Sequence, residues 1–261
     1  MQNLFEPLTN AFRKNGGFLS YDRFYSLIKK HSTITEDETT IAELVIASGY
    51  PIKEVKNGYK FKPMHTSYKH QEYVVIDIET NGSKPGRSQV IEIGAVKVKD
   101  GKIVDRLESY VFCAYLPQNI VDLTGIQPQD LIGAPSRREA LTKLKIFLGD
   151  AVFVAHNVEF DYTFLSASFK RFGLGCIGNM RLCTIELAKR TIESEKYGLL
   201  GLCDTLNIDM LAHHRAYSDA LCSWKIMEQS LKNLPKYIKT TDDLIKFSNS
   251  SKKERKRKEL Q

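Results

Sequence analysis

One short apolar segment limits the fold of this chain more than any other feature. Residues 73–79 read Tyr-Val-Val-Ile-Asp-Ile-Glu, a composition typical of a β-strand. Side chains two residues apart in a strand share a face, so Asp77 and Glu79 point one way and Ile76 and Ile78 the other. Two carboxylates on an apolar strand are costly unless a cation neutralises them. The strand is too apolar for a sheet edge, and a turn follows it, so we expect the two acids at the carboxyl end of an interior strand, where α/β proteins place active sites.

The pattern around this strand predicts an α/β fold with a mixed sheet flanked by helices. Two more strands, at 89–98 and 102–112, form a meander with Asp100-Gly101 as its tight turn. Beyond them, a short apolar strand at 151–155 lies among segments of helical periodicity. These helices are expected at 137–148, 158–171, 184–193, 198–206 and 216–231. Hairpins first and alternating helices afterwards indicate that helices cover the sheet.

The first 68 residues follow a different pattern. Helices are expected at 3–14 and 20–30, with Phe18 and Leu19 counted among the residues of a buried face. The sequence Thr35-Glu36-Asp37-Glu38 reads as a capping box with Thr35 as the cap, and the helix that it begins runs to about Ser48. Asn57-Gly58 then favours a type I′ hairpin turn.

Three helices followed by a hairpin is the order of a winged helix-turn-helix, so we expect a winged-helix-like domain at 1–68. A small helical domain used for protein contact fits about equally well. Lysines on the expected wing favour phosphate contact: Lys53, Lys56, Lys60 and Lys62.

Charge is distributed unevenly along the 261 residues, whose net charge is +7. Residues 1–70 contain 10 basic and 7 acidic side chains, residues 71–231 contain 18 and 20, and residues 232–261 contain 10 and 4. We therefore expect a main domain at 69–231 and a basic C-terminal tail at 232–261. Within this tail, Leu244, Ile245 and Phe247 are expected to form one amphipathic turn. A basic excess favours a polyanionic partner.

Composition excludes several classes of protein. Apolar residues make up 42% of the chain, which excludes a disordered or collagen-like protein. The five cysteines are odd in number and form no C-x-x-C, which argues against a disulfide framework or a zinc ribbon and favours reduced thiols in the cytoplasm. No stretch approaches 18 apolar residues, and no basic segment followed by an apolar run opens the chain, so neither membrane insertion nor secretion is expected.

Two further constellations carry potential chemistry. His156-Asn157-Val158-Glu159-Phe160-Asp161 follows a strand and enters a helix, where Asp161 also suits the helix dipole. His213-His214-Arg215-Ala216-Tyr217-Ser218-Asp219-Ala220 begins the last long helix. Small Ala216 and Ala220 leave room beside Asp219 for a ligand or a close helix contact. Taken alone, each segment has a structural reading: a helix cap for the first and a surface loop for the second.

Together and in this order, Asp77-x-Glu79, His156-Asn157-x-x-Phe160-Asp161 and His214-x-Ala216-x-x-Asp219-Ala220 resemble the three motifs of the DEDD superfamily of 3′–5′ exonucleases. A histidine five residues before the last aspartate is typical of the histidine branch, and His213 fails that register. The pattern is most similar to the epsilon proofreading subunits of bacterial DNA polymerase III. Their common D-T-E-T-T-G appears here as Asp77-Ile-Glu-Thr-Asn-Gly82, which keeps the acids and differs at two positions.

The resemblance implies a ribonuclease H-like fold and a two-metal hydrolase that uses Mg²⁺ or Mn²⁺. By resemblance, Asp77 bridges both cations, Glu79 and Asp219 complete the site of the attacking water, and Asp161 supports the second cation. His214 is then the general base. Residues implied to contact the terminal nucleotide or to orient the site are Thr80, Leu123, Thr124, Gly125, Ile126, His156 and Asn157. Structural packing explains several of these about equally well.

The expected function is a 3′–5′ DNA exonuclease that proofreads for a replicative polymerase, with a DNA 3′ end and the polymerase catalytic subunit as partners. RNA is not excluded, because an RNA-processing exonuclease of the same branch would carry the same motifs. A third hypothesis is a DNA-binding or assembly protein whose nuclease fold is only a scaffold. Retention of all four acids and His214 argues against it.

Overall fold

A computed structural model describes residues 2–32, 36–210, 213–251 and 254–255. Its centre is a mixed five-stranded sheet in the order β6-β5-β4-β7-β8. The strands are β4 (Tyr73–Thr80), β5 (Val90–Lys99), β6 (Lys102–Tyr110), β7 (Val152–Ala155) and β8 (Arg181–Cys183). β4 pairs antiparallel with β5 and parallel with β7. The interior position expected for residues 73–79 is therefore confirmed, as is the tight turn, since Asp100 and Gly101 both have positive φ between paired Lys99 and Lys102.

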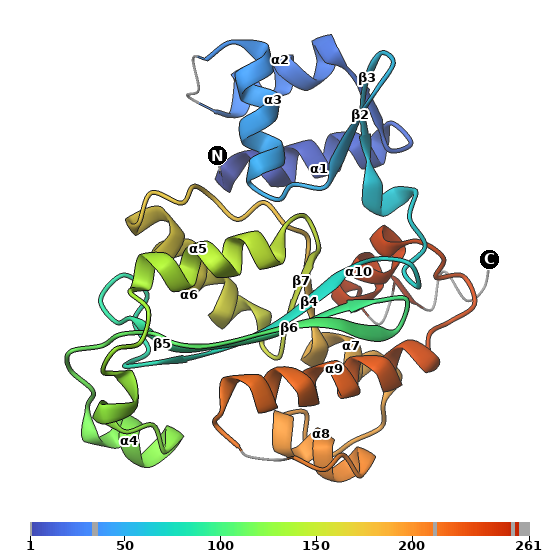
Figure 1. The fold of residues 1–261 in the computed structure, drawn as a ribbon. Coiled ribbons are helices and arrows are strands. Elements are labelled where there is room, and N and C mark those ends of the chain that lie inside the picture. The colour runs from blue at the N-terminus through green and yellow to red at the C-terminus, as the bar shows by residue number, and fades with distance from the viewer. Residues whose placement is uncertain (1, 33–35, 211–212, 252–253, 256–261) are drawn as a thin grey trace.

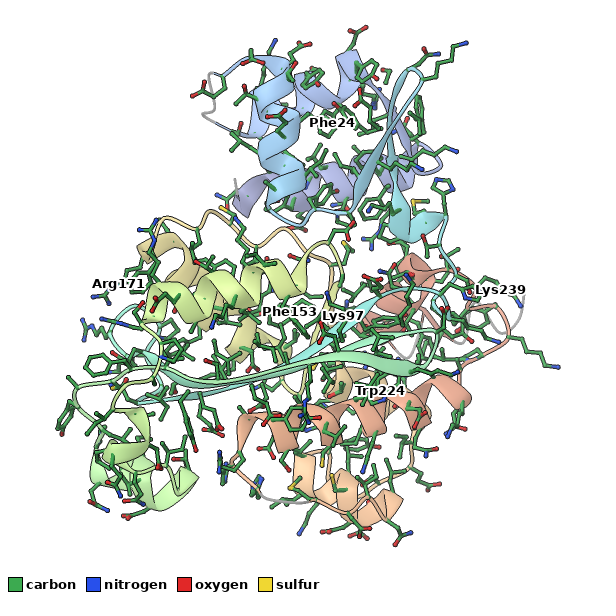
Figure 2. All side chains as sticks on the ribbon, in the orientation of Figure 1. Phe24, Lys97, Phe153, Arg171, Trp224 and Lys239 are labelled. Atoms are coloured by element: carbon green, nitrogen blue, oxygen red, sulfur yellow. The ribbon has the colours of Figure 1, made fainter. Side chains whose placement is uncertain are left out.

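Helices cover both faces of this sheet (Figure 1). The α-helices that belong to this part of the chain are α4 (Gln118–Thr124), α5 (Arg137–Leu148), α6 (Val158–Arg171), α7 (Thr184–Thr191), α8 (Leu199–Leu206) and α9 (Ala216–Lys232). Val74, Ile76 and Ile78 enter one core with α5 and α6, near Phe153 (Figure 2). The alternate residue Val75 packs against Trp224 of α9 on the other face. Strand periodicity therefore turns Asp77 and Glu79 toward the α9 side of the sheet.

The N-terminal segment has a core of its own. Its elements are α1 (Phe5–Lys14), β1 (Phe18–Ser20), α2 (Tyr21–His31), α3 (Glu38–Ala47), β2 (Ile52–Val55) and β3 (Gly58–Phe61), and its sheet has the order β1-β3-β2. Phe12, Phe24 and Phe61 are fully buried there, and Figure 2 marks Phe24 among them. Sequence periodicity misses β1, in which side chains alternate: Leu19 is buried, whereas Phe18 is 37% exposed and does not belong to the buried face.

Two local predictions in this segment are wrong. The cap of α3 is Asp37, whose carboxylate accepts a hydrogen bond from the Thr40 amide, and Thr35 lies outside the described residues. The hairpin turn is formed by Lys56 and Asn57 rather than by Asn57 and Gly58, because Val55 pairs with Gly58. It is not a type I′ turn, since neither Lys56 nor Asn57 has the positive φ that this turn requires. Gly58 serves another purpose: a Cβ there would lie 2.0 Å from the Leu19 carbonyl oxygen, so a side chain would separate β1 from β3.

The C-terminal segment differs from the expected tail. Residues 241–249 form α10 (Thr241–Asn249), which begins with a Thr240–Asp243 capping box. Leu244, Ile245 and Phe247, expected in one amphipathic turn, form the apolar face of this longer helix and are buried in the core of the sheet. Arg13 of α1 binds Asp242 of α10 at 2.6 Å, which ties the two ends of the chain together. Most of the basic run that follows lies outside the described residues.

Three short 3₁₀ turns complete the described structure: η1 (Gln2–Leu4), η2 (Lys62–Met64) and η3 (Pro128–Leu131). All five cysteines are free thiols. Among the described helices, none combines the length and the apolar character that a membrane crossing requires.

Candidate active site

Asp77 and Glu79 lie at the carboxyl end of β4, where one of the paired residues on β5 is a glycine. Asp77 lies opposite Gly94 and Glu79 lies opposite Glu92. A Cβ on Gly94 would stand 2.1 Å from the carbonyl carbon of Ala216, the first residue of α9. Only glycine at this position lets the start of α9 approach the strand so closely. The close helix contact expected from small Ala216 is therefore present.

This approach brings Asp219, in the first turn of α9, next to the two acids of β4. One carboxylate oxygen each from Asp77, Glu79 and Asp219 lies within 4.8 Å of the other two. The Asp219 Oδ2 accepts a hydrogen bond from the His214 amide at 3.3 Å. Its Oδ1 is buried and has no hydrogen-bond partner among the described residues. An orphaned carboxylate oxygen in such a cluster is the expected consequence of a site built for a cation.

Asp161 comes from the opposite side of the sheet, in the first turn of α6, and is 3% exposed. Its carboxylate lies close enough to Asp77 for its charge to raise the pKa of Asp77. Because α6 follows β7, the neighbour of β4, the parallel pairing delivers this acid to the same end of the sheet.

The four carboxylates repel one another in a poorly solvated site. Burial first, and then the charge of Asp161, raise the pKa of Asp77 well above its usual range. Burial and the charge of Asp219 raise the pKa of Glu79 to about 7. Burial likewise raises the pKa of Asp161 and of Asp219. The residues fit divalent cations of the Mg²⁺ class, which prefer carboxylate oxygens and would neutralise this charge.

Two histidines border the cluster. Their ring centroids lie 3.7 Å apart with the ring planes tilted by 30°, and the His213 Nδ1 lies 3.6 Å from the Asp219 Oδ2. His214 has a positive φ of 59°. Burial, followed by the neighbouring His213, lowers the pKa of His214. The structure thus places both imidazoles at the site, including the one that the motif register sets aside.

Sequence reasoning missed a network that holds α9 in place. Glu92, 7% exposed on β5, accepts hydrogen bonds from Arg215 at 3.0 Å and from the Ala216 amide at 3.1 Å. Arg215 also donates to the Tyr110 hydroxyl at 2.7 Å. The carboxylate therefore caps the amino end of α9, which suits the helix dipole. Nothing in the sequence pairs Glu92 with a residue 123 positions away.

The residues that the resemblance implies to contact the substrate or orient the site differ in burial and in hydrogen bonding. Thr80 is buried and donates to the Gly82 carbonyl at 3.0 Å. His156 is hydrogen-bonded through Nδ1 to Thr184 at 2.8 Å, and its Nε2 is buried without a partner among the described residues. Asn157 has φ of 67° and precedes α6 without capping it through its side chain.

The segment 123–126 ends α4, and Ile126 packs there with Ile91, Cys113 and Leu131. The Thr124 hydroxyl donates to the Ile120 carbonyl at 2.9 Å and accepts from the Ile126 amide. Gly125 is the left-handed cap of α4, and Ile126 is buried. Leu123, at 52% exposure, is the member whose side chain is free to meet a ligand.

Comparison with known proteins assigns the family. Residues 74–227 match the RNase T family model, described as exonuclease. The chain is 38% identical over 197 residues to the PolC-type DNA polymerase III of Staphylococcus haemolyticus, which covers 73% of this chain and 13% of that protein. It is 36% identical over 175 residues to the same polymerase of Halalkalibacterium halodurans, covering 66% of this chain and 12% of the relative.

Solved structures agree in fold. A zinc-bound complex of E. coli ExoI with single-stranded DNA has a TM-score of 0.58 and 18% identity, and the match covers 64% of this chain and 42% of that one. Exonuclease I in another crystal structure has a TM-score of 0.59, with 17% identity and coverages of 68% and 43%. The five-stranded sheet with its flanking helices is thus the exonuclease fold. The chain belongs to the RNase T family, within the DEDD superfamily of 3′–5′ exonucleases, whose members depend on divalent metals.

Proposed function

We propose that this chain removes nucleotides from the 3′ end of DNA in a reaction that needs two divalent cations, Mg²⁺ or Mn²⁺. The observation that carries the proposal is the convergence of Asp77, Glu79 and Asp219, with an unpaired carboxylate oxygen, inside an exonuclease fold. Bound cations would supply charge neutralisation at the phosphodiester, an acidified water and a stabilised leaving oxygen.

Each residue has a distinct part in this proposal. Asp77, on the central strand between the other acids, would hold both cations. Glu79 and Asp219 would complete the site of the attacking water, and Asp161 would support the second cation. His214 would take the proton of the attacking water, and the lowered pKa of its imidazole favours the neutral form that accepts a proton. The terminal nucleotide would be bordered by Thr80, Leu123 and residues 124–126. The active site would be oriented by His156 and Asn157.

DNA as the substrate is supported by the relatives. The matched proteins are named DNA polymerases, and ExoI was solved with DNA oligonucleotides. Removal of mismatched ends during replication is the role that we propose, with a polymerase catalytic subunit as partner. The matched segment spans about an eighth of the length of the PolC-type relatives.

We further propose a winged-helix-like domain at 1–68, an exonuclease domain at 69–231 and a basic C-terminal segment at 232–261 whose helix α10 packs on the core of the exonuclease domain. The sheet order β1-β3-β2 supports the first assignment. The hairpin lysines Lys53, Lys56 and Lys60 are exposed and available to phosphate, whereas Lys62 is paired with Asp150. Helix α3 exposes Leu44 and Ile46, a surface better suited to protein than to DNA.

The decisive experiment compares four substrates of equal length and sequence: single-stranded DNA, single-stranded RNA, and primer–templates with a matched or a mismatched 3′ end. We expect mononucleotide release in Mg²⁺ and none in EDTA, with the mismatched DNA end degraded faster than the matched one. Asp219→Asn serves as the inactive control. Preference for RNA would replace DNA as the substrate, and failure to release mononucleotides from any substrate would leave only the scaffold hypothesis.

A further inference from the structure

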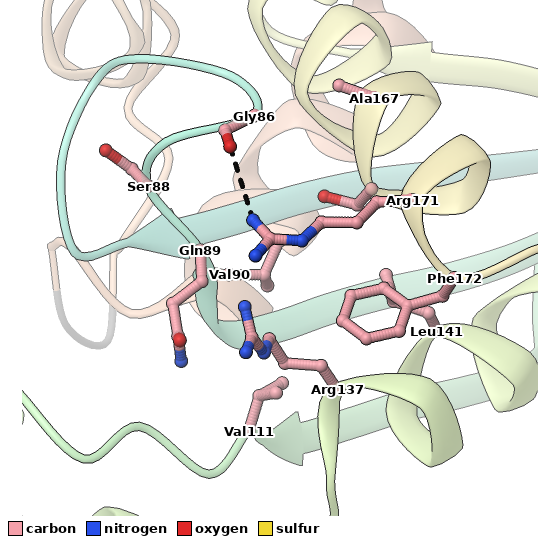
Figure 3. Close-up of a pocket in the computed structure, with 11 residues that line it drawn as sticks. Gly86, Ser88, Gln89, Val90, Val111, Arg137, Leu141, Ala167, Arg171 and Phe172 are labelled. Carbon is pink, nitrogen blue, oxygen red and sulfur yellow. Dashed lines mark hydrogen bonds between the residues drawn. The ribbon is translucent and has the colours of Figure 1, made fainter.

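A basic groove lies beside the loop that joins β4 to β5. Arg137 at the start of α5 and Arg171 at the end of α6 extend their guanidinium groups toward the same hollow, next to Gln89 and Phe172 (Figure 3). A second, open depression of about 280 Å³ adjoins this hollow, shares Gln89, Arg137 and Phe172 with it, and also borders Arg138. We call this feature the arginine groove.

Positive charge in the groove is not compensated by the protein. The groove arginines and the adjoining loop together carry five cationic side chains: Lys84, Arg87, Arg137, Arg138 and Arg171. Within the described part of the chain, none of the five makes an ion pair. Neutral groups hold the two central side chains: Arg171 donates to the Gly86 carbonyl at 3.2 Å, and Arg137 lies 5.3 Å from the centre of the Phe172 ring.

Helix stability does not explain these arginines. Arg137 and Arg138 occupy the first turn of α5, where the helix dipole disfavours cations. The amino end of α5 is already satisfied by the Ser136–Glu139 capping box, so the arginines add nothing to the cap. Two guanidinium groups that face one hollow repel each other, and an anion between them removes that repulsion. Planar guanidinium forks match phosphate oxygens in particular.

The groove is connected to the acidic site by two elements. Helix α6 carries Asp161 in its first turn and Arg171 at its end, ten residues later, a distance of about 15 Å along the helix. The groove loop begins directly after Thr80, and Asn81 accepts from the Gln89 amide across it at 2.8 Å. A nucleic-acid strand with its 3′ end at the acids would reach the groove after about four nucleotides at the ~3.4 Å spacing of stacked bases.

We propose that the arginine groove binds the backbone phosphates of a nucleic-acid strand whose 3′ end occupies the acidic site. This inference rests on the proposed function, because it assigns the path of the same substrate. The phosphate, rather than the base or sugar, is recognised, so the groove contributes affinity and strand position without sequence preference.

The first test measures binding without catalysis, by fluorescence anisotropy of a 5′-labelled 12-nucleotide single strand in EDTA. We expect Arg137→Gln/Arg171→Gln to weaken binding about tenfold and to lower the slope of log K against log salt by about 1.4, the value for two lost phosphate contacts. The matched control, Lys102→Gln/Lys143→Gln, removes the same charge from exposed positions outside the groove and should change binding less than twofold. Equal binding by the groove variant and the control would overturn the proposal.

The second test separates the groove from the acids. A p-nitrophenyl ester of thymidine 5′-phosphate and a trinucleotide reach only the acidic site, whereas the 12-nucleotide strand also reaches the groove. For the groove variant we expect unchanged rates on the two short substrates and a KM about tenfold higher on the long one. A parallel loss on all three substrates would overturn the proposal. If the wild-type chain cleaves none of them, the proposed function fails, and the anisotropy measurement still decides whether the groove binds the strand.

Discussion

The acidic site and the arginine groove are two concentrations of uncompensated like charge, about 15 Å apart along α6, but they differ in burial. Asp161 and Asp219 of the acidic site are almost fully enclosed, whereas the groove side chains Arg138 and Arg171 are exposed. Water screens the arginines and cannot screen the carboxylates to the same extent. The acids therefore need a bound cation to remain ionised, whereas the arginines remain charged without a bound phosphate.

The same difference predicts opposite behaviour on mutation. Neutralising a buried acid removes repulsion, so the metal-free fold should gain stability while catalysis is lost. Neutralising an exposed arginine should leave the stability nearly unchanged, since surface substitutions typically alter it by less than about 0.5 kcal/mol. Thermal unfolding in EDTA of acid variants and groove variants therefore tests whether the two regions are as different as their burial indicates.

The largest effect is expected for Asp77→Asn. Its side chain lies centrally among the acids, so the amide should remove cation binding and lower the turnover at least about 10³-fold, a barrier increase of roughly 4 kcal/mol. The variant should also unfold at a higher temperature than the wild type in EDTA and gain no stability from added Mn²⁺. Turnover on labelled single strands and melting with and without Mn²⁺ measure both effects. A melting temperature below that of the wild type in EDTA would contradict the repulsion argument.

The next largest effect is expected for His214→Ala. Loss of a general base should lower turnover about 10²-fold or more, and the stabilisation by Mn²⁺ should persist because the four acids remain. His213→Ala is the matched control, since both rings border Asp219 and only one fits the motif register. Turnover and Mn²⁺-dependent melting of the two variants distinguish them. A larger loss for His213→Ala would transfer the role of the base to His213.

A smaller effect is expected for Glu92→Gln, which tests positioning rather than chemistry. Glutamine can still accept from the Ala216 amide, but it loses the ion pair with Arg215 that anchors the start of α9. We expect kcat of Glu92→Gln to fall about tenfold, with KM for a 12-nucleotide strand unchanged. The kcat of Glu92→Ala should fall further, because the Ala216 amide also loses its acceptor. Glu108→Gln, on the exposed strand β6, should have no effect. A change confined to KM would indicate contact with substrate instead.

The last prediction concerns stability rather than turnover and involves His156, a partly buried group that stays neutral and needs no counterion. Burial lowers the pKa of His156 to about 4, below its unfolded value of about 6.5. The unfolded chain therefore binds more protons between these values, so this residue costs stability as pH falls through 6.5 toward 4, by at most about 3 kcal/mol. Urea unfolding at pH 7, 6 and 5 should show a shallower decline for His156→Asn than for the wild type. Parallel declines would show that the imidazole is already charged in the fold.

Local periodicity was sufficient for the elements whose partners lie nearby in sequence. The helix at 137–148 is bounded by the Ser136 cap and Gly149, so its ends could be predicted to the residue. Asp100-Gly101 encodes its own turn. In contrast, β1 and β8 have three residues each, too few to show a period, and they form because strands far away in the chain pair with them.

The sequence by itself determined which residues could carry the chemistry, because alternation along β4 puts Asp77 and Glu79 on one face and the motif order adds Asp161 and Asp219. Only the tertiary structure decided how these acids meet and what surrounds them. Gly94 and Glu92 draw α9 against β5, α10 packs its apolar face into the core, and the ends of α5 and α6 bring Arg137 and Arg171 together. These contacts join residues that lie tens to more than a hundred positions apart in the sequence. At such separations, local sequence patterns do not predict which side chains will be in contact.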